Sequence, residues 1–198
     1  MNLPNQLTVS RFALTLALLV VMFWPVEFYL QMTAALLLFS AASLTDYFDG
    51  KLARQHKLIT NFGILMDPLA DKILVCSVFI AFVGLRWLPA WMAVVIVARE
   101  LAITGLRLLA ASKNMVLAAE GYGKHKTISQ IVAIISVLVA HSCGEWGPAG
   151  RAIFEFPLLG RAWVLWVVQI SVWLAVALTM VSGALYLWRN RQFYLQDL

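Results

Sequence analysis

The sequence predicts an all-α integral membrane protein with six transmembrane helices, and three observations support this fold class. The chain has 198 residues, of which 62% are hydrophobic and only 13% are charged, and its mean hydropathy is +0.84. Apolar runs long enough to span about 30 Å of hydrocarbon recur along its length. A soluble core of this size could not bury so much apolar surface. We therefore expect a single membrane domain over residues 1–198.

The expected helices follow from these apolar runs and from the polar residues between them. Residues 1–11 are short and mixed, with Asn2 and Pro4 as turn formers, and predict an interfacial entry turn or a short interfacial helix. The first apolar run has no small-residue cleavage site, so we expect a retained helix. Residues 141–150 are expected to form a loop and 151–161 an irregular or interfacial stretch. The six spans are expected at residues 12–31, 33–49, 62–86, 88–110, 128–141 and 162–188.

The basic residues sit at the ends of the apolar runs and predict the topology. Six spans put both termini on one side, and the bias of Lys and Arg makes that side cytoplasmic. The net charge of +5 then reflects topology and the binding of anionic lipid or phosphate, and no nucleic acid is expected as a partner. The opposite side would carry Arg86, Arg151 and Arg161. The cytoplasmic side would carry Arg11, Lys51, Arg54, Lys57, Lys113, Lys124, Lys126, Arg189 and Arg191.

Four carboxylates lie close together in this otherwise apolar sequence. Asp46 and Asp49 are three residues apart, and Asp67 and Asp71 are four apart, so in helices each pair projects from one face. Hard oxygen ligands at this density suit Mg²⁺ or Mn²⁺, and two such ions roughly 3.5–4 Å apart can serve phosphoryl transfer. The alternative is two carboxylate pairs at helix ends that bond nearby Arg and Lys side chains. Spacing alone leaves both interpretations open.

The carboxylates belong to a longer pattern. Residues 46–71 match Asp-x₂-Asp-Gly-x₂-Ala-Arg-x₈-Gly-x₃-Asp-x₃-Asp, and this stretch resembles the signature of the CDP-alcohol phosphotransferases. The resemblance implies an enzyme that binds two divalent metal ions and passes a phosphoryl group from a CDP-linked donor to an alcohol, with release of CMP. It implies that Asp46, Asp49 and Asp67 are metal ligands. Asp71 would be both a ligand and the base that takes the proton of the acceptor hydroxyl.

Other residues near the motif are expected to bind the CDP-linked donor. Arg54 offers a planar fork of donors that suits a diphosphate, and Gly50 and Gly63 would let the diphosphate approach the backbone. The remaining candidates are carried over from the family resemblance, and the two threonines among them can instead cap helices. The full set is Asn5, Thr8, Gly50, Arg54, Thr60 and Gly63.

Basic residues in and beside the later spans predict an anion site. An arginine within a span is a functional-site hypothesis by default, although snorkelling could explain Arg107 near a helix end. Residues 121–127 are expected to form a glycine-flanked basic turn before a helix, which suits either an anion or a topology anchor. These segments resemble the bacterial phosphatidylglycerophosphate synthase branch, whose acceptor is sn-glycerol 3-phosphate. By that resemblance the acceptor phosphate is held by Arg99, Arg107, Lys124 and Lys126.

The branch resemblance implies a complete reaction and a place for it. The donor would be CDP-diacylglycerol, and the products would be phosphatidylglycerol phosphate and CMP in phospholipid biosynthesis. The enzyme would lie in the cytoplasmic (inner) membrane of a bacterium as a multi-pass protein, with its active site facing the cytoplasm. Homodimers are common in the family, so a homodimer is expected.

Two alternatives stay open. The same chemistry could use inositol phosphate, serine or phosphatidylglycerol as acceptor, but serine carries no phosphate and would not explain the extra basic groups. A small ion transporter could also use carboxylates within spans. Such a transporter should show internal repeats, whereas the aspartate pattern occurs once.

Overall fold

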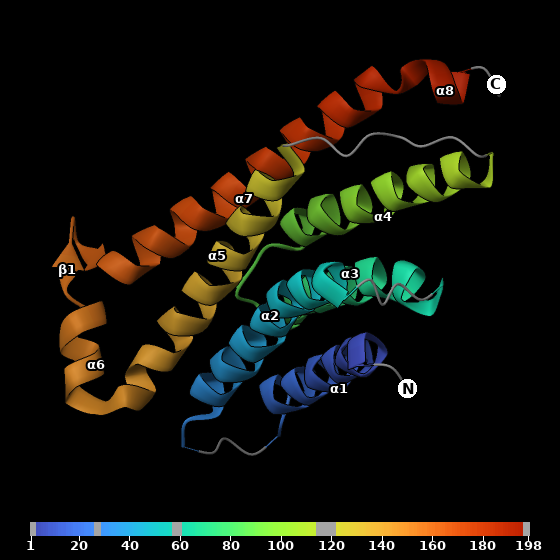
Figure 1. The fold of residues 1–198 in the computed structure, drawn as a ribbon. Coiled ribbons are helices and arrows are strands. Elements are labelled where there is room, and N and C mark those ends of the chain that lie inside the picture. The colour runs from blue at the N-terminus through green and yellow to red at the C-terminus, as the bar shows by residue number, and fades with distance from the viewer. Residues whose placement is uncertain (1–2, 26–28, 57–60, 114–121, 196–198) are drawn as a thin grey trace.

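The computed structural model describes the backbone of residues 3–25, 29–56, 61–113 and 122–195 (Figure 1). Within these ranges, the side chains of residues 3–8, 46–56, 61–68, 71, 122–124, 193 and 195 lie outside the description. The expectation of an all-helical bundle is confirmed in this part of the chain, apart from one small hairpin. The elements in order are α1 (Leu3–Met22), α2 (Gln31–His56), α3 (Asn61–Gly84), α4 (Ala90–Ser112), α5 (Tyr122–Ser142), η1 (Cys143–Trp146), α6 (Gly147–Phe154), β1 (Pro157–Leu158), β2 (Arg161–Ala162), α7 (Trp163–Arg189) and α8 (Arg191–Leu195).

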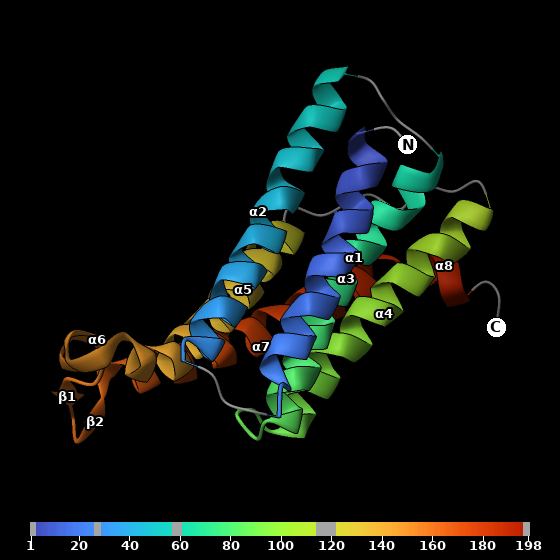
Figure 2. The same cartoon turned by 90° about the horizontal axis from the view of Figure 1, so that it is seen from below.

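The long helices form one bundle in which successive helices run in opposite directions (Figures 1 and 2). α1 packs against α2 and α3, α5 packs against α2 and α7, and α4 packs against α3 and α7. The start of α1, the end of α2, the start of α3, the end of α4 and α8 lie toward one end of the bundle. We call this the motif end, because α2 and α3 carry the aspartate motif there. α6 and the β1–β2 hairpin lie at the far end.

Apolar residues at helical spacing form the core of the bundle. In α3, Leu74, Val78 and Phe82 recur every four residues and are buried. Phe39 of α2 and Ile134 of α5 are fully buried in the same cluster. Residues spaced in this way form a stripe along one helix face, and burial of that stripe drives the packing of each helix. The core therefore joins the N-terminal helices to α5.

The buried stripe of α4 contains a charged residue. Met92, Ile96, Glu100 and Ile103 follow one another at intervals of three or four residues, and all four are buried. α7 carries a matching stripe with several hydroxyl-bearing residues, among them Thr179. The helical period thus turns Glu100 into the interior, where α4 meets its neighbours.

The outer surface is rich in large apolar side chains, as a lipid environment requires. Leu16, Leu37, Val94 and Leu101 on three different helices are each more than half exposed. By length and composition, α7 and the stretch His125–Phe154 could each cross a membrane, and shorter apolar helices occur at Val9–Met22, Gln31–Thr45 and Lys72–Gly84. A helical bundle with an apolar outer surface fits an all-α membrane protein.

The N-terminal segment differs from the expectation. We expect an entry turn or a separate short helix over residues 1–11, but α1 begins at Leu3 and continues to Met22. Pro4 lies in the first turn, where its missing N–H breaks no intrahelical hydrogen bond. The predicted end of the first span at residue 31 is also wrong. Trp24 precedes Pro25, and a residue before proline is disfavoured in the helical conformation.

The segment between α5 and α7 is more ordered than the loop that we expect. It forms η1, α6 and a hairpin in which β1 pairs antiparallel with β2. Glu145 in η1 caps the start of α2, because its carboxylate accepts hydrogen bonds from the backbone N–H of Met32 at 2.7 Å and of Thr33 at 2.8 Å. Trp146 Nε1 donates to the Thr33 hydroxyl at 2.8 Å. These contacts join two segments more than a hundred residues apart, which no local pattern predicts.

Candidate functional site

The aspartate motif lies on two helices that contact each other. α2 is helical through Asp46 and Asp49, and α3 is helical through Asp67 and Asp71. The prediction that both segments are helical is confirmed, so the spacing puts each pair on one face of its helix. The four side chains lie outside the described part of the chain, and their common pocket stays a prediction.

The predicted donor-binding residues fall on the same helices and beside them. Their side chains lie outside the described residues, as does the whole of Thr60, so their roles stay predictions. Both glycines of the pattern lie inside helices and not in a connecting turn. In chain order, α1 carries Asn5 and Thr8, α2 carries Gly50 and Arg54, and α3 carries Gly63.

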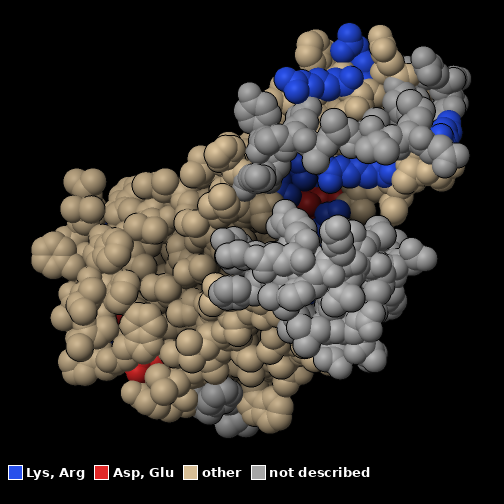
Figure 3. Space-filling model, in the orientation of Figure 1, with Lys and Arg blue, Asp and Glu red and all other residues tan. Residues whose placement is uncertain are grey.

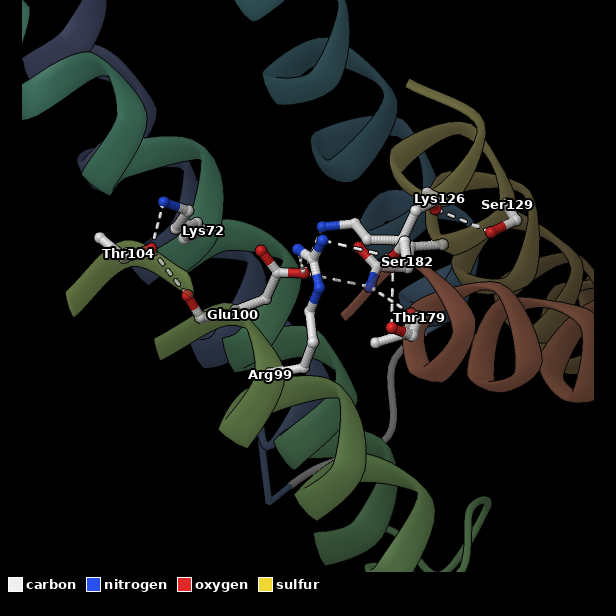
Figure 4. Close-up of polar contacts among 9 residues, drawn as sticks. Lys72, Arg99, Glu100, Thr104, Lys126, Ser129, Thr179 and Ser182 are labelled. Carbon is white, nitrogen blue, oxygen red and sulfur yellow. Dashed lines mark hydrogen bonds and ion pairs between the residues drawn. The ribbon is translucent and has the colours of Figure 1, made fainter. Parts of the chain in front are cut away.

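Glu100 is the centre of a buried polar cluster that joins α4, α5 and α7 (Figure 4). Its side chain is 5% exposed. Lys126 Nζ donates a hydrogen bond to Glu100 Oε1 and forms an ion pair with it. Gln130 Nε2 lies 3.5 Å from the same oxygen and donates to the Thr179 hydroxyl at 3.0 Å. The interior of the bundle therefore contains a charge pair between α4 and α5 that Gln130 ties to α7.

Arg99, the residue before Glu100 in α4, contacts the same carboxylate. Its Nη1 lies 3.3 Å from Glu100 Oε1, and its Nη2 lies 3.3 Å from the Ser182 hydroxyl of α7. Arg99 Nε is buried and donates to no residue that the structure describes. Two cations, Arg99 and Lys126, thus contact one carboxylate oxygen. A buried guanidinium nitrogen that still has no acceptor favours an anionic ligand beside it.

Lys72 connects this cluster to the aspartate motif. It follows Asp71 directly in α3, and its Nζ donates to the Thr104 hydroxyl of α4. Thr104 in turn donates to the backbone carbonyl of Glu100 at 2.6 Å. A small cleft opens between these helices. It is lined by Lys72, Val75, Glu100, Lys126, Thr127 and Gln130.

The structure brings together only some of the predicted acceptor residues. Arg99 and Lys126 meet at Glu100. Arg107 lies two turns further along α4, where its Nε is 3.3 Å from the Tyr186 hydroxyl and its guanidinium carbon is 5.3 Å from the Tyr186 ring centroid. Lys124 belongs to α5, and its side chain lies outside the described residues.

The expected basic turn at residues 121–127 is wrong. α5 begins at Tyr122, so Lys126 occupies a helix and is 6% exposed. The segment continues the helical period of α5, which turns Lys126 toward α4. Sequence reasoning also left Glu100 without a role. The signal was present, because a lone carboxylate on the apolar face of a helix predicts a buried partner.

Lys and Arg side chains gather at the motif end of the molecule (Figure 3). On the face shown, blue atoms lie where α4 and α7 end, and blue and red atoms together line a hollow beside them. Among the described residues, the left half of this face shows no Lys or Arg atoms. A larger groove at the far end is lined by aromatic residues such as Trp91 and Trp173, with Arg161 as its only described charged residue. The polar cluster, and not this groove, is the candidate site.

Comparison with known proteins identifies the family. The family model for CDP-alcohol phosphatidyltransferases matches residues 1–181. The chain belongs to the CDP-alcohol phosphatidyltransferase family. The motif resemblance is therefore confirmed, and this CDP-alcohol phosphatidyltransferase is a transferase.

Curated relatives of this CDP-alcohol phosphatidyltransferase match almost its whole length. It is 37% identical to the CDP-diacylglycerol–glycerol-3-phosphate 3-phosphatidyltransferase of Bacillus subtilis (strain 168), covering 96% of this chain and 95% of the relative. A protein of the same name from Rickettsia bellii (strain RML369-C) is 33% identical, covering 98% and 97%. The probable phosphatidylglycerophosphate synthase of Mycobacterium tuberculosis (strain ATCC 25618 / H37Rv) is 35% identical, covering 95% and 81%.

Proposed function

We propose that this enzyme transfers the phosphatidyl group of CDP-diacylglycerol to sn-glycerol 3-phosphate. The products are phosphatidylglycerol phosphate and CMP. The names of the relatives in Bacillus, Rickettsia and Mycobacterium support both the donor and the acceptor. The observation that carries the acceptor assignment is that Arg99 and Lys126 meet at Glu100 inside the bundle, because a phosphate-bearing acceptor needs such cationic partners and serine does not.

In the proposed reaction, the 1-hydroxyl oxygen of glycerol 3-phosphate attacks the phosphorus that carries the diacylglycerol. A new P–O bond forms, the bond from this phosphorus to the oxygen shared with CMP breaks, and CMP leaves with that bonding pair. Asp71 takes the hydroxyl proton, and Arg54 binds the diphosphate. Positioning and electrostatics do most of the work in such transfers. Asp71 and Lys72 are neighbours on α3, and Lys72 contacts Thr104 of α4 beside the polar cluster. This contact supports a base on α3 that acts next to an acceptor held by the cluster.

The acceptor phosphate is proposed to bind at the polar cluster around Glu100. Arg99 and Lys126 are its main partners, Arg107 is exposed to the solvent or lipid further along α4, and Lys124 is a further candidate. Arg99 offers a planar fork that can hold two phosphate oxygens, while Lys126 offers a compact charge. The acceptor hydroxyl would then face the carboxylates of α2 and α3. This arrangement uses Arg99 Nε, which is buried and donates to no residue that the structure describes.

The four aspartates suit two divalent metal ions, Mg²⁺ or Mn²⁺. Asp46, Asp49, Asp67 and Asp71 offer hard oxygen donors from two contacting helices, and this donor set fits either ion. Among the side chains that the structure describes, no group of three or more His, Cys, Asp or Glu could hold a metal. Bound ions supply Lewis-acid polarisation of the diphosphate and offset the charge on the leaving CMP.

The enzyme is proposed to lie in the bacterial cytoplasmic membrane as a single domain with six spans. Both termini and the motif end would face the cytoplasm. The alternating direction of the long helices α1 to α5 and α7 supports this, as does the gathering of Lys and Arg at the motif end. A homodimer is proposed from the family, and cross-linking in detergent and in vesicles would test it.

Release of CMP by the purified, detergent-solubilised protein tests the reaction. CDP-diacylglycerol and Mg²⁺ are supplied with sn-glycerol 3-phosphate, myo-inositol phosphate, serine or phosphatidylglycerol, or with no acceptor. We expect release only with glycerol phosphate. Release with another acceptor would keep the chemistry and overturn the acceptor. No release with any acceptor, from folded protein, would favour the transport alternative.

A further inference from the structure

Glu100 is an unusual residue for its position. It lies in the buried stripe of α4 whose other members are Met92, Ile96 and Ile103. A carboxylate loses its hydration there, and replacing a whole buried ion pair by apolar residues of similar volume is often neutral or stabilising. Packing alone therefore does not explain an acid at this position. A role that needs its charge does.

The contacts of Glu100 show what the charge does. The described donors all bond one oxygen, Oε1. It accepts hydrogen bonds from Lys126 Nζ and Gln130 Nε2 of α5 and from Arg99 Nη1 of α4. Gln130 also bonds Thr179 of α7, so the carboxylate is fixed from three helices. The buried carboxylate of Glu100 thus helps to fix the positions of the Lys126 ammonium and the Arg99 guanidinium relative to each other.

We infer that Glu100 is a positioning residue that orients Lys126 and Arg99 toward the phosphate of the acceptor. The inference rests on the proposed function, in which these two cations bind that phosphate. Lys126 has a flexible four-carbon stem, so its ammonium needs an anchor to stand at one place. Glu100 supplies such an anchor, and it also holds Arg99, whose buried Nε donates to no residue that the structure describes. Glu100 itself does not touch the substrate or the reacting atoms.

This role predicts an effect on one substrate. Loss of the carboxylate charge should loosen Lys126 and Arg99, and so raise the KM for glycerol 3-phosphate. The KM for CDP-diacylglycerol should hardly change, because the predicted donor residues lie on α1, α2 and α3. Residues that orient the ligands of metal sites typically contribute about ten- to a hundredfold to affinity, and we expect an effect of that order.

Glu100→Gln tests the inference, with Glu145→Gln as the matched control. Both variants remove a carboxylate charge, but Glu145 lies at the far end, where it caps α2. We expect Glu100→Gln to raise the KM for glycerol phosphate at least about tenfold, with kcat and the KM for CDP-diacylglycerol changed less than about threefold. Glu145→Gln should lower the thermal unfolding temperature and leave both KM values unchanged.

A double-mutant cycle with Lys126→Met shows whether Glu100 acts through Lys126. If it does, Glu100→Gln changes the KM for glycerol phosphate much less in the Lys126→Met background than in the wild type. Equal effects in the two backgrounds would overturn the inference. If Glu100→Gln does not fold, Glu100→Asp replaces it, because that variant keeps the charge and shifts the oxygen. A raised acceptor KM then supports the positioning role.

The outcomes separate this inference from the proposed function. Wild-type protein that releases no CMP with glycerol phosphate overturns the proposed function, whatever Glu100 does. An active wild type whose Glu100→Gln variant has an unchanged acceptor KM overturns the positioning role alone. A variant that loses thermal stability with both KM values unchanged, or a pair of Glu100 variants that both fail to fold, assigns Glu100 to the stability of the bundle instead.

Discussion

Gly183 of α7 lies so close to Arg99 of α4 that a Cβ added to Gly183 would stand 2.9 Å from Arg99 Cγ. The Arg99 side chain runs along the backbone of α7 before it meets Ser182 and Glu100. Gly183 therefore leaves the space in which Arg99 is held. A larger residue at this position must move the arginine.

We predict that Gly183→Ala weakens the use of glycerol phosphate. A displaced Arg99 would bind the acceptor phosphate less well, and a misplacement of about 1 Å can cost up to about a hundredfold in rate. We expect kcat/KM for glycerol phosphate to fall about tenfold or more, measured by CMP release. Gly105→Ala in α4 is the matched control, because a Cβ there meets no atom within 4 Å. Equal activities in the two variants would contradict the prediction.

The cap that Glu145 forms on α2 predicts a loss of stability without a loss of function. Glu145→Ala leaves the N–H groups of Met32 and Thr33 without their acceptor and removes a negative charge from a helix N-terminus. We expect a loss of about 1–2 kcal/mol in the free energy of unfolding, the usual size of such a cap. Thermal or denaturant unfolding in detergent measures it. An unfolding midpoint equal to that of the wild type would show that the cap contributes little.

Asp71→Asn is expected to abolish transfer while the protein stays folded. The amide keeps the size of the side chain but cannot take the acceptor proton, and general-base catalysis typically contributes about a hundred- to ten-thousandfold. Single-turnover release of CMP measures the loss. Glu155→Gln, at the far end of the molecule, is the control and should release CMP as the wild type does. An Asp71→Asn variant with more than about a tenth of the wild-type rate would remove Asp71 from the role of base.

Removal of divalent metal should stop the reaction reversibly. The aspartate set has the oxygen chemistry that Mg²⁺ and Mn²⁺ prefer, and we expect no CMP release in excess EDTA. Addition of either ion beyond the chelator should restore it, and Asp46→Asn should shift the restoring concentration upward. Full activity in EDTA with metal-free reagents would show that the aspartates serve another purpose.

The helices and the family could be predicted from the sequence, because both depend on local patterns. Apolar runs mark α3, α4 and α7 to within a few residues, and the spacing of the aspartates identifies the motif directly. Some helix ends differ from the prediction. The helical continuation through Pro4 and the helical start of α5 at Tyr122 override the local turn signals.

The polar cluster could not be predicted in the same way, because its contacts are tertiary. Glu100 and Lys126 lie in different helices, and no pattern in either segment predicts that the two residues form an ion pair. Arg99 and Lys126 were identified as phosphate ligands from the family pattern. Their shared carboxylate appears only when α4 and α5 are packed together.

The unbroken length of α2 has a consequence for how the two substrates meet. Its 26 residues extend about 39 Å at 1.5 Å per residue, which exceeds the roughly 30 Å of the hydrocarbon layer. In the proposed topology, Asp46 and Asp49 then lie about 22 and 27 Å from the outer end of the helix, in the cytoplasmic third of a hydrocarbon layer that begins at that end. CDP-diacylglycerol would react at these aspartates without leaving its leaflet. Glycerol phosphate would reach them from the cytoplasmic side without crossing the rest of the hydrocarbon layer.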